Sequence, residues 1–479
     1  MTQEKFKEII AYMADCIRGS EFENHVYAVG GAMRDLVMGN EIKDIDVCVD
    51  VPQGGIGLAE YLDGKGLLTR TPVVYPTYGT AMFRFKRFGD EEIESVHTRG
   101  EQYHDKESRN PETAFAPIEE DCIRRDLTMN ALYLRISNNE ILDLTGKGID
   151  DIKNRICRVT NDNPDIVFDD DSLRILRVIR FACKYGFEIE EKTLESMCRN
   201  ADRLSIITQE RITDEFNKMM MTDNPATALC LLRYVGVMKY VLPELEETYD
   251  MVQNAFHFGT VWEHTLAVVS HNASDNKPTL PVRIACVMHD IGKIKTRTVG
   301  EDGRVHFYDH ETVGADMVRE IMHRMRYANG ITEEVCFHVK NHMITKAWGD
   351  DLGHMKMKKL RTLMFRCKTP ERFERLMEVI DADNKSHKPE HCLNNQVTEI
   401  RKVADKELVE HISMFGYRLP INGEDVMECR GIEAGPDVKA CLTYCQNLAF
   451  SNPEITKEEC LKNIKNYKIP VNDDKSKVR

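Results

Sequence analysis

The chain has 479 residues, a length that corresponds to about three domains of average size. Its hydrophobic content of 42% is ordinary for a globular protein, which excludes global disorder and collagen-like or low-complexity classes. The 65 Lys and Arg residues against 79 Asp and Glu residues give a net charge of −14. So acidic a chain does not coat nucleic acid indiscriminately, and a polyanion must be bound by local basic surfaces or through metal ions.

The first residues predict an amphipathic helix, because apolar residues recur there at helical spacing: Phe6, Ile9, Ile10, Met13 and Ile17. Acidic residues interrupt this stretch, so it is no signal peptide, and no later stretch is long enough to span a bilayer. The 15 cysteines include no C-x-x-C pair and stand singly in apolar segments. Such cysteines are typical of reduced thiols in a cytoplasmic protein, with neither a disulfide framework nor a zinc finger.

Strand and helix signals alternate over residues 26–150, whereas helical periodicity dominates after about residue 164. We therefore expect an α+β protein that begins with a mixed α/β head and continues as mostly helical domains. The expected boundaries are a head over 20–150, a helical neck and body over 151–250, a further helical domain over 255–390 and a helical tail over 391–479.

The segment VGGAMRDLVMGNEIKDIDVCVD (29–50) carries the first chemical pattern. Gly30 and Gly31 leave a strand and open a helix, so that backbone N–H groups approach phosphates closely, and Arg34 lies within reach of a phosphate oxygen. Asp44 and Asp46 are separated by one residue on a strand, so they share a face and repel each other unless a cation binds between them. A hard cation with oxygen ligands, Mg²⁺ above all, fits this pair.

Taken singly, a Gly-Gly pair is more often an ordinary tight turn, and a D-x-D pair is more often the solvated end of a strand. Their combination in strand–turn–helix–strand order is far more specific. It indicates a metal-dependent triphosphate site.

Several ordered motifs over residues 25–225 resemble the polymerase β-type nucleotidyltransferases, in particular the class II CCA-adding enzymes and bacterial poly(A) polymerases. They are Gly30-Gly31-Ala32-Met33-Arg34-Asp35, Asp44-Ile45-Asp46, Arg124-Arg125-Asp126, Asp170-Asp171-Ser172-Leu173-Arg174 and Glu210-Arg211-Ile212. Asp170 stands where the family has Glu. The resemblance implies template-independent addition of CMP and AMP to the 3′ end of tRNA.

Basic residues of the later motifs are candidate nucleotide ligands. Arg174, Arg177 and Arg180 follow one another at intervals of three on a predicted helix, so we expect a cationic ridge on one face. The alternative is a solvated helix face, and for Arg124 and Arg125 it is an ordinary surface pair. The resemblance implies that Asp171 and Arg174 read the base of CTP and then ATP.

The polar stretch RGEQYHDKESRNPET (99–113) predicts a mobile loop between strands. It resembles the flexible loop of CCA-adding enzymes, with Asp105 and Arg109 as its charged pair. Family members that add only two cytidines tend to lack this loop, so its presence favours complete CCA addition.

Potential metal ligands gather between residues 257 and 391, and in this order they are His264, His289, Asp290, His310, His342 and Asp381. A lone His is usually a surface or core residue, but six imidazole and carboxylate groups suit one divalent metal site. The adjacent His289 and Asp290 reach one site only from near a helix end, which Gly292 supplies. The pattern over 255–390 resembles the HD superfamily of metal-dependent phosphohydrolases.

The resulting hypothesis is a tRNA nucleotidyltransferase of the cytoplasm that uses CTP and ATP, with Mg²⁺ at the head and a divalent transition metal or Mg²⁺ at the HD site. Its partners are tRNA and the two nucleotides, with no membrane and no obligate protein partner. A poly(A) polymerase is the alternative with the same chemistry. A nucleotide phosphohydrolase, driven by the HD site and with an RNA-binding head, is the alternative of another class.

Overall fold

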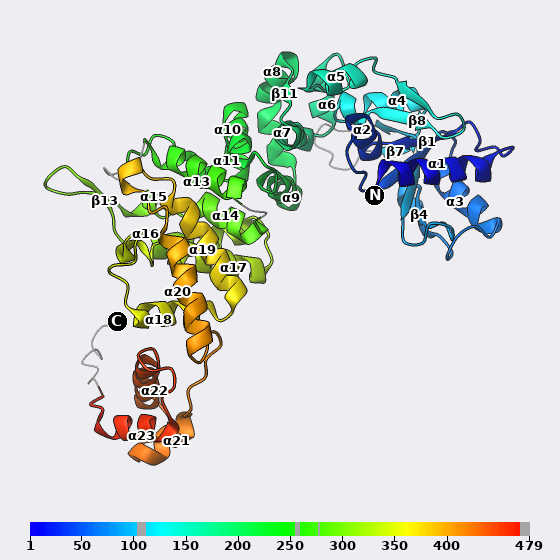
Figure 1. The fold of residues 1–479 in the computed structure, drawn as a ribbon. Helices are drawn as coiled ribbons and strands as arrows, with labels where there is room; N and C mark the ends of the chain where they lie inside the picture. Colours follow the sequence, from blue (N-terminus) through cyan, green and yellow to red (C-terminus); the bar gives the residue numbers. More distant parts are fainter. Residues whose placement is uncertain (103–111, 254–258, 276–277, 470–479) are drawn as a thin grey trace. The chain divides into compact units, whose positions relative to one another are not determined.

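The computed structural model describes residues 1–102, 112–253, 259–275 and 278–469. The chain divides into two compact units, one made of residues 1–246 with 324–326 and the other of residues 247–323 with 327–479 (Figure 1). The expected loop residues Asp105 and Arg109 lie outside the described part of the chain. The α+β class expected from the sequence is confirmed, because a mixed sheet of the first unit is followed by helical domains.

The head of the first unit is built on a seven-stranded sheet with the order β3-β4-β5-β2-β1-β8-β9. Strands β2 and β5 run parallel, and the other neighbours in the sheet are antiparallel. The bounds are β1 Val26–Val29, β2 Ile45–Val49, β3 Val73–Tyr75, β4 Thr80–Phe83, β5 Ile93–His97, β8 Leu132–Arg135 and β9 Glu140–Asp143. The central strand β1 is buried along its whole length. Because β1 is buried between β2 and β8, the turn that follows it is held at one edge of the sheet.

Short elements connect and cover this sheet. Strands β6 (Arg99–Gln102) and β7 (Glu112–Phe115) form a separate two-stranded sheet. The helices are α1 Gln3–Ile17, α2 Gly31–Met38, α3 Gly54–Gly64, α4 Ile118–Ile123 and α5 Gly148–Asn154, with 3₁₀ turns at Pro76–Tyr78 and Thr128–Asn130. The amphipathic helix expected at the N-terminus is confirmed, because α1 buries Phe6, Ile9, Ile10, Met13 and Ile17 and Thr2 caps its first turn.

A helical region follows the head within the same unit. Its helices are α6 Pro164–Asp170, α7 Leu173–Tyr185, α8 Glu191–Asn200, α9 Gln209–Met220, α10 Pro225–Val235, α11 Met238–Val241 and α12 Pro243–Glu246, with a 3₁₀ turn at Ala201–Ile206. Two-residue strands β10 (Ile156–Cys157) and β11 (Glu188–Ile189) pair in parallel beside them. Helix α7 buries an apolar face that includes Leu173, Leu176 and Ile179, as its sequence periodicity predicts.

The second unit is almost wholly helical. Its helices are α13 Val261–Asp275, α14 Leu280–Met288, α15 Lys293–Thr296, α16 His310–Arg324, α17 Asn329–Asn341, α18 Met357–Cys367, α19 Pro370–Asn384, α20 Gln396–Glu410, α21 Gly423–Arg430, α22 Pro436–Ala449 and α23 Lys457–Asn466. Strands β12 (Arg297–Val299) and β13 (Val305–Phe307) form a small hairpin, and 3₁₀ turns occupy Lys346–Trp348 and Pro389–His391.

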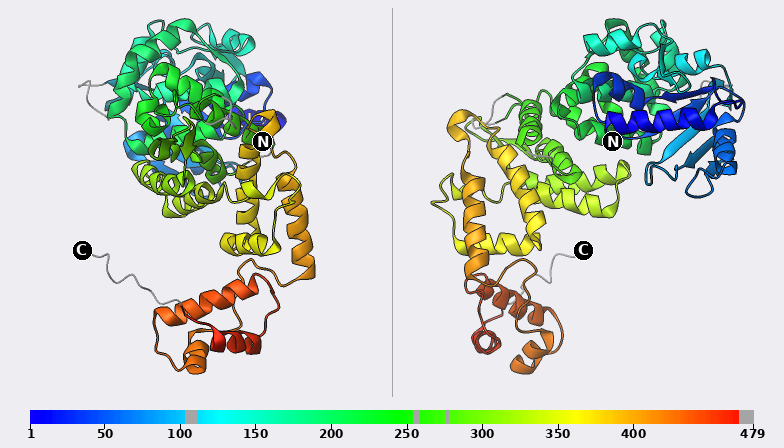
Figure 2. Two further views of the ribbon diagram at one scale, coloured as in Figure 1. Left: turned by 90° about the vertical axis from the view of Figure 1, so that its left-hand side faces the viewer. Right: turned by 45° about the vertical axis from the view of Figure 1, so that its right-hand side comes forward.

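Two apolar cores organise the C-terminal half of this unit. Trp348 lies in the first, together with residues of α18, α19 and α20, so α20 continues the core of the preceding domain beyond residue 390. The second holds buried residues of α21, α22 and α23, coloured orange to red in Figure 2, among them Cys441 and Cys445. No helix among the described residues is long and apolar enough to cross a bilayer.

Candidate active sites

The first site begins at the glycine turn between β1 and α2. Gly30 caps the helix with a φ of 68°, a conformation that L side chains rarely adopt. A side chain there would place its Cβ 3.6 Å from Oδ2 of Asp46 and 3.8 Å from Nη1 of Arg125. Asp46 is opposite Val29 in the antiparallel pair of β1 and β2, so strand register brings the carboxylate beside the turn. Glycine at this position therefore keeps the space between a carboxylate and an arginine open.

A third acidic residue, Glu94, joins this edge of the sheet and was missed in the sequence. Asp46 and Glu94 are register partners in the parallel pair of β2 and β5, and both line one pocket. Asp44, by contrast, lies one residue before β2 with an exposed side chain, and the residues that line the pocket do not include it. A lone charged residue in an alternating strand gives no local sign of such pairing, so only the topology of the sheet reveals Glu94.

These carboxylates crowd one another. Burial, Glu94 and Asp44, in that order of effect, raise the pKa of Asp46 to about 6, although Arg125 opposes the shift. A carboxylate whose pKa is raised by like charges gains most from a bound cation. The arrangement therefore fits a divalent metal ion with oxygen ligands.

Arg124 and Arg125, both expected to bind nucleotide, share the buried carboxylate of Asp121. Arg124 Nη2 donates to Oδ1 of Asp121 at 2.7 Å, and Arg125 Nη2 donates to Oδ2 at 2.9 Å. The hydroxyl of Tyr133 donates to the same carboxylate at 2.8 Å. Burial alone would raise the pKa of Asp121, but the two arginines outweigh it and hold that pKa well below its usual range. The two guanidinium groups are thereby fixed in place at the pocket wall.

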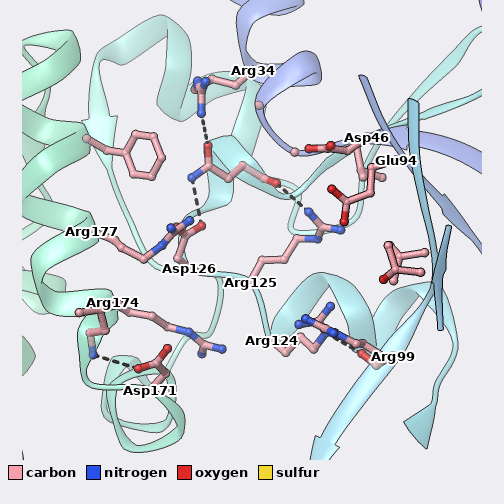
Figure 3. Close-up of a pocket in the computed structure, with 18 of the residues that line it drawn as sticks. Arg34, Asp46, Glu94, Arg99, Arg124, Arg125, Asp126, Asp171, Arg174 and Arg177 are labelled. Atoms are coloured by element: carbon pink, nitrogen blue, oxygen red, sulfur yellow. Dashed lines mark hydrogen bonds and ion pairs between the residues drawn. The ribbon is translucent and has the colours of Figure 1, made fainter. Parts of the chain in front are cut away.

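Arg34 is held in a second network that links the head to helix α7 (Figure 3). Its Nη1 donates to the side-chain oxygen of Asn130 at 2.7 Å, and Asn130 Nδ2 donates to Asp126 at 3.0 Å. Asp126 also accepts from Arg177 Nε at 2.8 Å. The Arg34 guanidinium lies 5.2 Å from the ring centre of Phe181, so its cation is stabilised from the α7 side as well.

Arg174 and Arg177 line the pocket, whereas Arg180 is not among its lining residues, so the expected role of Arg180 in nucleotide binding stays a prediction. Its Nε donates instead to the buried carboxylate of Glu215 at 2.6 Å. An α-helix turns by about 100° per residue, so a residue six positions after Arg174 is rotated about 120° away from it. Arg177 still reaches the partner of Arg180, because its Nη1 lies 3.8 Å from Oε1 of Glu215.

The pair expected to read the base lies where α6 gives way to α7. Asp171 accepts a bond of 2.7 Å from Nη2 of Arg211, and Arg174 donates to the backbone oxygen of Val167 at 3.1 Å. Both side chains line the pocket, as does Arg211, which the sequence interpretation placed in a motif but gave no role. Asp171 and Arg174 thus offer an acceptor and a donor fork side by side.

One cavity of about 590 Å³ joins the two groups of this site: it is lined by Asp46 and Glu94, and by the arginines Arg34, Arg124, Arg125, Arg174, Arg177 and Arg211. Carboxylates occupy the strand end and arginines the wall and the α7 end, as Figure 3 shows. The volume lies in the range of pockets that enclose small organic ligands. A ligand that carries both negative charge and a hydrogen-bonding ring edge matches this distribution.

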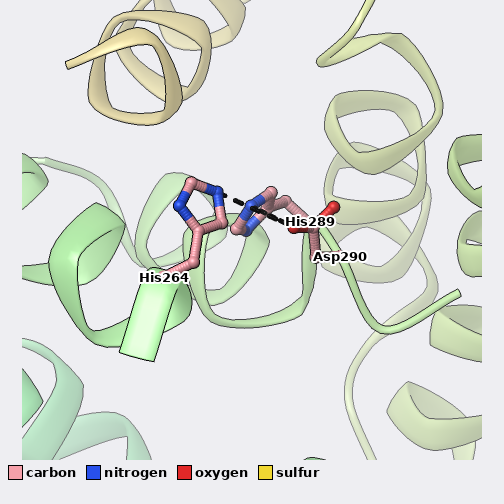
Figure 4. Close-up of side chains that lie close together, drawn as sticks. All are labelled: His264, His289 and Asp290. Carbon is pink, nitrogen blue, oxygen red and sulfur yellow. Dashed lines mark ion pairs between the residues drawn. The ribbon is translucent and has the colours of Figure 1, made fainter. Parts of the chain in front are cut away.

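The second site joins side chains that lie on four helices of the second unit or directly after them. His264 comes from α13, His289 and Asp290 follow the end of α14, His310 begins α16, and His342 follows α17. Asp290 is central, with its carboxylate oxygens 3.2 Å from His289 Nε2, 3.3 Å from His310 Nε2, 3.7 Å from His264 Nε2 and 3.8 Å from His342 Nε2. The His-Asp pair lies at a helix end, as its sequence predicts, and Figure 4 shows it beside His264.

Asp383, and not the expected Asp381, is the aspartate of α19 that lies beside the histidines. Asp381 accepts from Nζ of Lys385 at 2.7 Å and is not among the residues that line this cavity. Asp383 is buried, and its Oδ1 lies 3.1 Å from Nε2 of His264. Both residues belong to α19, and two helical positions differ by about 200°, so packing alone decides which one faces the histidines.

Three of the imidazoles are oriented by bonds to the local backbone. Nδ1 of His289, His310 and His342 lies 2.9, 2.8 and 2.7 Å, respectively, from the carbonyl oxygen three residues earlier. Nδ1 therefore carries the proton in the neutral ring, and Nε2 presents a lone pair. All three Nε2 atoms are buried without a hydrogen-bond partner, which is the condition expected of metal ligands.

The ligand atoms fall into two groups that share Asp290. One contains His264, His289 and Asp290, the other contains Asp290, His310 and His342, and within each group the atoms lie within 4.8 Å of one another. Burial, together with His289 and His310, lowers the pKa of His342 to about 3, so its ring is neutral. Burial lowers the pKa of His289 and His310, but the nearby Asp290 outweighs this effect and raises both pKa values. Protons therefore compete with a metal ion for the imidazole nitrogens of these two residues. This donor set fits divalent metal ions.

Family models match three successive parts of the chain. A poly(A) polymerase head domain matches residues 26–158, a probable RNA- and SrmB-binding site of polymerase A matches residues 186–248, and an HD domain matches residues 261–384.

Relatives match over most of their length. A protein of Neisseria meningitidis serogroup B named multifunctional CCA protein is 30% identical over 383 residues, which cover 76% of this chain and 84% of that one. A CC-adding tRNA nucleotidyltransferase of Thermus thermophilus is 26% identical over 440 residues, covering 90% of this chain and 91% of that one.

Solved structures share the fold. The Bacillus stearothermophilus CCA-adding enzyme in complex with CTP aligns with a TM-score of 0.64 at 20% identity, covering 97% of this chain and 98% of that one. The Thermotoga maritima CCA-adding enzyme complexed with tRNA aligns with a TM-score of 0.57 at 19% identity, covering 96% of this chain and 94% of that one.

Proposed function

The chain belongs to the tRNA nucleotidyltransferase and poly(A) polymerase family, with an HD domain in its second unit, and on that premise we propose that it adds CMP and AMP from CTP and ATP to the 3′ end of tRNA. The observation that carries this proposal is the pocket of about 590 Å³ in the first unit. This cavity is lined by carboxylates that suit a metal ion, by arginines held in fixed positions, and by Asp171 and Arg174, which can form hydrogen bonds with a nucleobase.

The carboxylates of Asp46 and Glu94 hold Mg²⁺ in this proposal, together with Asp44. Asp44 is close enough to raise the pKa of Asp46, so a cation bound to Asp46 is attracted by both. When bound, the ion supplies charge stabilisation at the α-phosphate and lowers the pKa of the attacking hydroxyl. The residues around it fix where the α-phosphate and the 3′-hydroxyl meet, and pyrophosphate is the leaving group.

The triphosphate is bound by the glycine turn and by the arginines of the wall. Gly30 and Gly31 line the pocket at the N-terminus of α2, where backbone N–H groups are available to phosphate oxygens. Arg124 and Arg125 are held rigid by Asp121, so they bind phosphate oxygens with little loss of side-chain entropy. Arg34 acts mainly through its network, because two of its nitrogens already donate to Asp35.

The base is selected by Asp171 and Arg174, which present an acceptor and a donor fork to its edge. Arg211 holds the carboxylate of Asp171. A base whose edge does not match leaves these groups unpaired, and this is how a protein surface discriminates without a nucleic-acid template.

The HD site is proposed to be a phosphohydrolase centre with two divalent ions that share Asp290. Its imidazole nitrogens favour a transition metal over Mg²⁺, in contrast to the oxygen ligands of the head. His264, His289 and Asp383 would belong to one ion, and His310 and His342 to the other. Lys293, whose Nζ lies 2.6 Å from Asp290 Oδ2, adds positive charge for a phosphate.

One assay tests the main proposal: labelled CTP and ATP are incubated with a tRNA that lacks its 3′ CCA. Discrete addition of C, C and A supports the proposal. Arrest after two cytidines would assign the activity named for the Thermus relative. A long A tract would identify a poly(A) polymerase, and loss of nucleotide without addition would leave only the phosphohydrolase.

A further inference from the structure

A stacked pair of rings lies at the HD cavity and takes no part in the ligand set described above. His306 and Tyr308 line the same cavity as Asp290, His310 and His342. Their ring centres are 5.2 Å apart and their planes differ by 9°, so the two rings are parallel. Tyr308 is 69% exposed, which is unusual for a large aromatic ring beside a buried polar site.

Local structure fixes the position of this pair. His306 lies on β13, where it is the register partner of Thr298 in the hairpin with β12. Tyr308 follows the strand directly, and Asp309 after it has a φ of 56°, which turns the chain into α16. The tyrosine is therefore two residues from the proposed ligand His310 and cannot move far from the site without moving that ligand.

The size of the cavity limits what it encloses. Its volume is about 230 Å³, below the range of about 300–1,000 Å³ typical of pockets that enclose a whole small-molecule ligand. Asp290, Lys293, His310 and His342 occupy its charged part, where a phosphate group fits. The remainder of a larger phosphate ester extends out of the cavity, and the exposed ring of Tyr308 is available to contact it.

We propose that His306 and Tyr308 form a stacking platform for the base of a nucleoside monophosphate whose phosphate lies at the HD ligands. Every nucleobase has a flat face that stacks on an aromatic ring, so the platform favours nucleotides over other phosphate esters without selecting one base. The inference rests on the proposed phosphohydrolase function of the HD site, and it names the residues that would bind the base of a nucleotide there.

The test compares two ligands that differ only in the base, adenosine 5′-monophosphate and ribose 5-phosphate. Their Kd values are measured by calorimetry on the metal-loaded full chain, in an Arg174→Ala background that weakens nucleotide binding at the head. The variants are Tyr308→Ala, Tyr308→Phe and the matched control Tyr234→Ala, whose ring is 68% exposed on α10 of the other unit. Since Tyr308 is exposed, its replacement leaves the core intact.

We expect Tyr308→Ala to raise the Kd of adenosine monophosphate about 5- to 100-fold and to leave that of ribose 5-phosphate unchanged. Tyr308→Phe should bind like the parent protein, and Tyr234→Ala should have no effect. In hydrolysis assays with adenosine monophosphate, Tyr308→Ala should raise KM and leave kcat unchanged. Equal binding of the two ligands by the parent protein, or equal weakening of both by Tyr308→Ala, would overturn the platform.

The outcome also separates the two proposals. If neither ligand is hydrolysed but Tyr308→Ala still abolishes the preference for the nucleotide, the platform stands and the phosphohydrolase function fails. If both ligands are hydrolysed with equal KM values and the parent protein shows no preference, the function stands and the platform fails.

Discussion

The head pocket and the HD cavity both concentrate acidic side chains, but they stabilise them in opposite ways. In the head, Asp46 is half-buried among other carboxylates and its pKa is raised to about 6. In the HD cavity, Asp290 is fully enclosed, yet Lys293 and His289 outweigh burial and hold its pKa well below the usual range. The carboxylate at the HD site is thus paired with positive charges of the protein itself, whereas Asp46 in the head lies among like charges that a cation would offset.

The largest expected effect is at the head carboxylates. Asp46→Asn and Glu94→Gln should each lower CMP and AMP incorporation about a thousandfold or more, because several kcal/mol of transition-state stabilisation depend on the bound ion. The measurement is single-turnover incorporation at saturating Mg²⁺. Because both changes remove repulsion between carboxylates, the metal-free variants should melt no lower than the parent protein.

Asp90→Asn, which alters an exposed carboxylate of the head, is the matched control and should leave incorporation unchanged. Near-normal activity of Glu94→Gln would show that Glu94 is not a metal ligand, and that only Asp44 and Asp46 of the D-x-D motif remain as candidates.

The next effect separates the two sites. Asp290→Asn should remove phosphohydrolase activity and lower the metal content of the purified chain, because both ligand groups share this carboxylate. CCA addition should persist at more than about half of the parent rate, since the head has its own ligands. In an Asp46→Asn background, which removes the metal site of the head, elemental analysis after loading with Mn²⁺ or Ni²⁺ should find two ions per chain, and one ion would contradict a shared Asp290.

A smaller effect concerns the choice of base. Asp171→Ala should reduce discrimination between CTP or ATP and the other two triphosphates by about 10- to 100-fold, with a lesser fall in kcat. Selectivity ratios from kcat/KM for all four nucleotides measure this effect. Glu195→Ala, an exposed carboxylate on α8, should change none of them. An unchanged ranking in Asp171→Ala would show that the base is read by other residues.

The smallest expected effect is on acid stability. Burial would raise the pKa of Asp126, but Arg177 and Asn130 lower it to about 2, below its value of about 3.9 in an unfolded chain. The carboxylate therefore stabilises the fold above about pH 4, by about 2 kcal/mol, and this contribution is lost as the pH falls from about 4 towards 2. The difference in Tm between the parent protein and Asp126→Asn should shrink over that interval, and a constant difference would contradict the assignment.

Sequence patterns predicted features formed by residues that are close in the sequence. Contacts between residues far apart in the sequence depend on how the elements pack, and the patterns did not predict them. The buried face of α1 and the His-Asp pair at the end of α14 follow from spacing alone. Glu94 could not be found in this way, because it reaches Asp46 only through the parallel pairing of strands 48 positions apart. Nor could spacing decide between Asp381 and Asp383.

The orientation of the HD imidazoles has a consequence for how such a site changes over evolutionary time. His289, His310 and His342 are each held by a carbonyl three residues earlier, so each ligand is a module that depends on its own turn of chain. Replacing one of them removes a donor without misdirecting the other two. Ligands can therefore be gained or lost one at a time. A site that binds fewer metal ions can arise in this way while the surrounding helices stay unchanged.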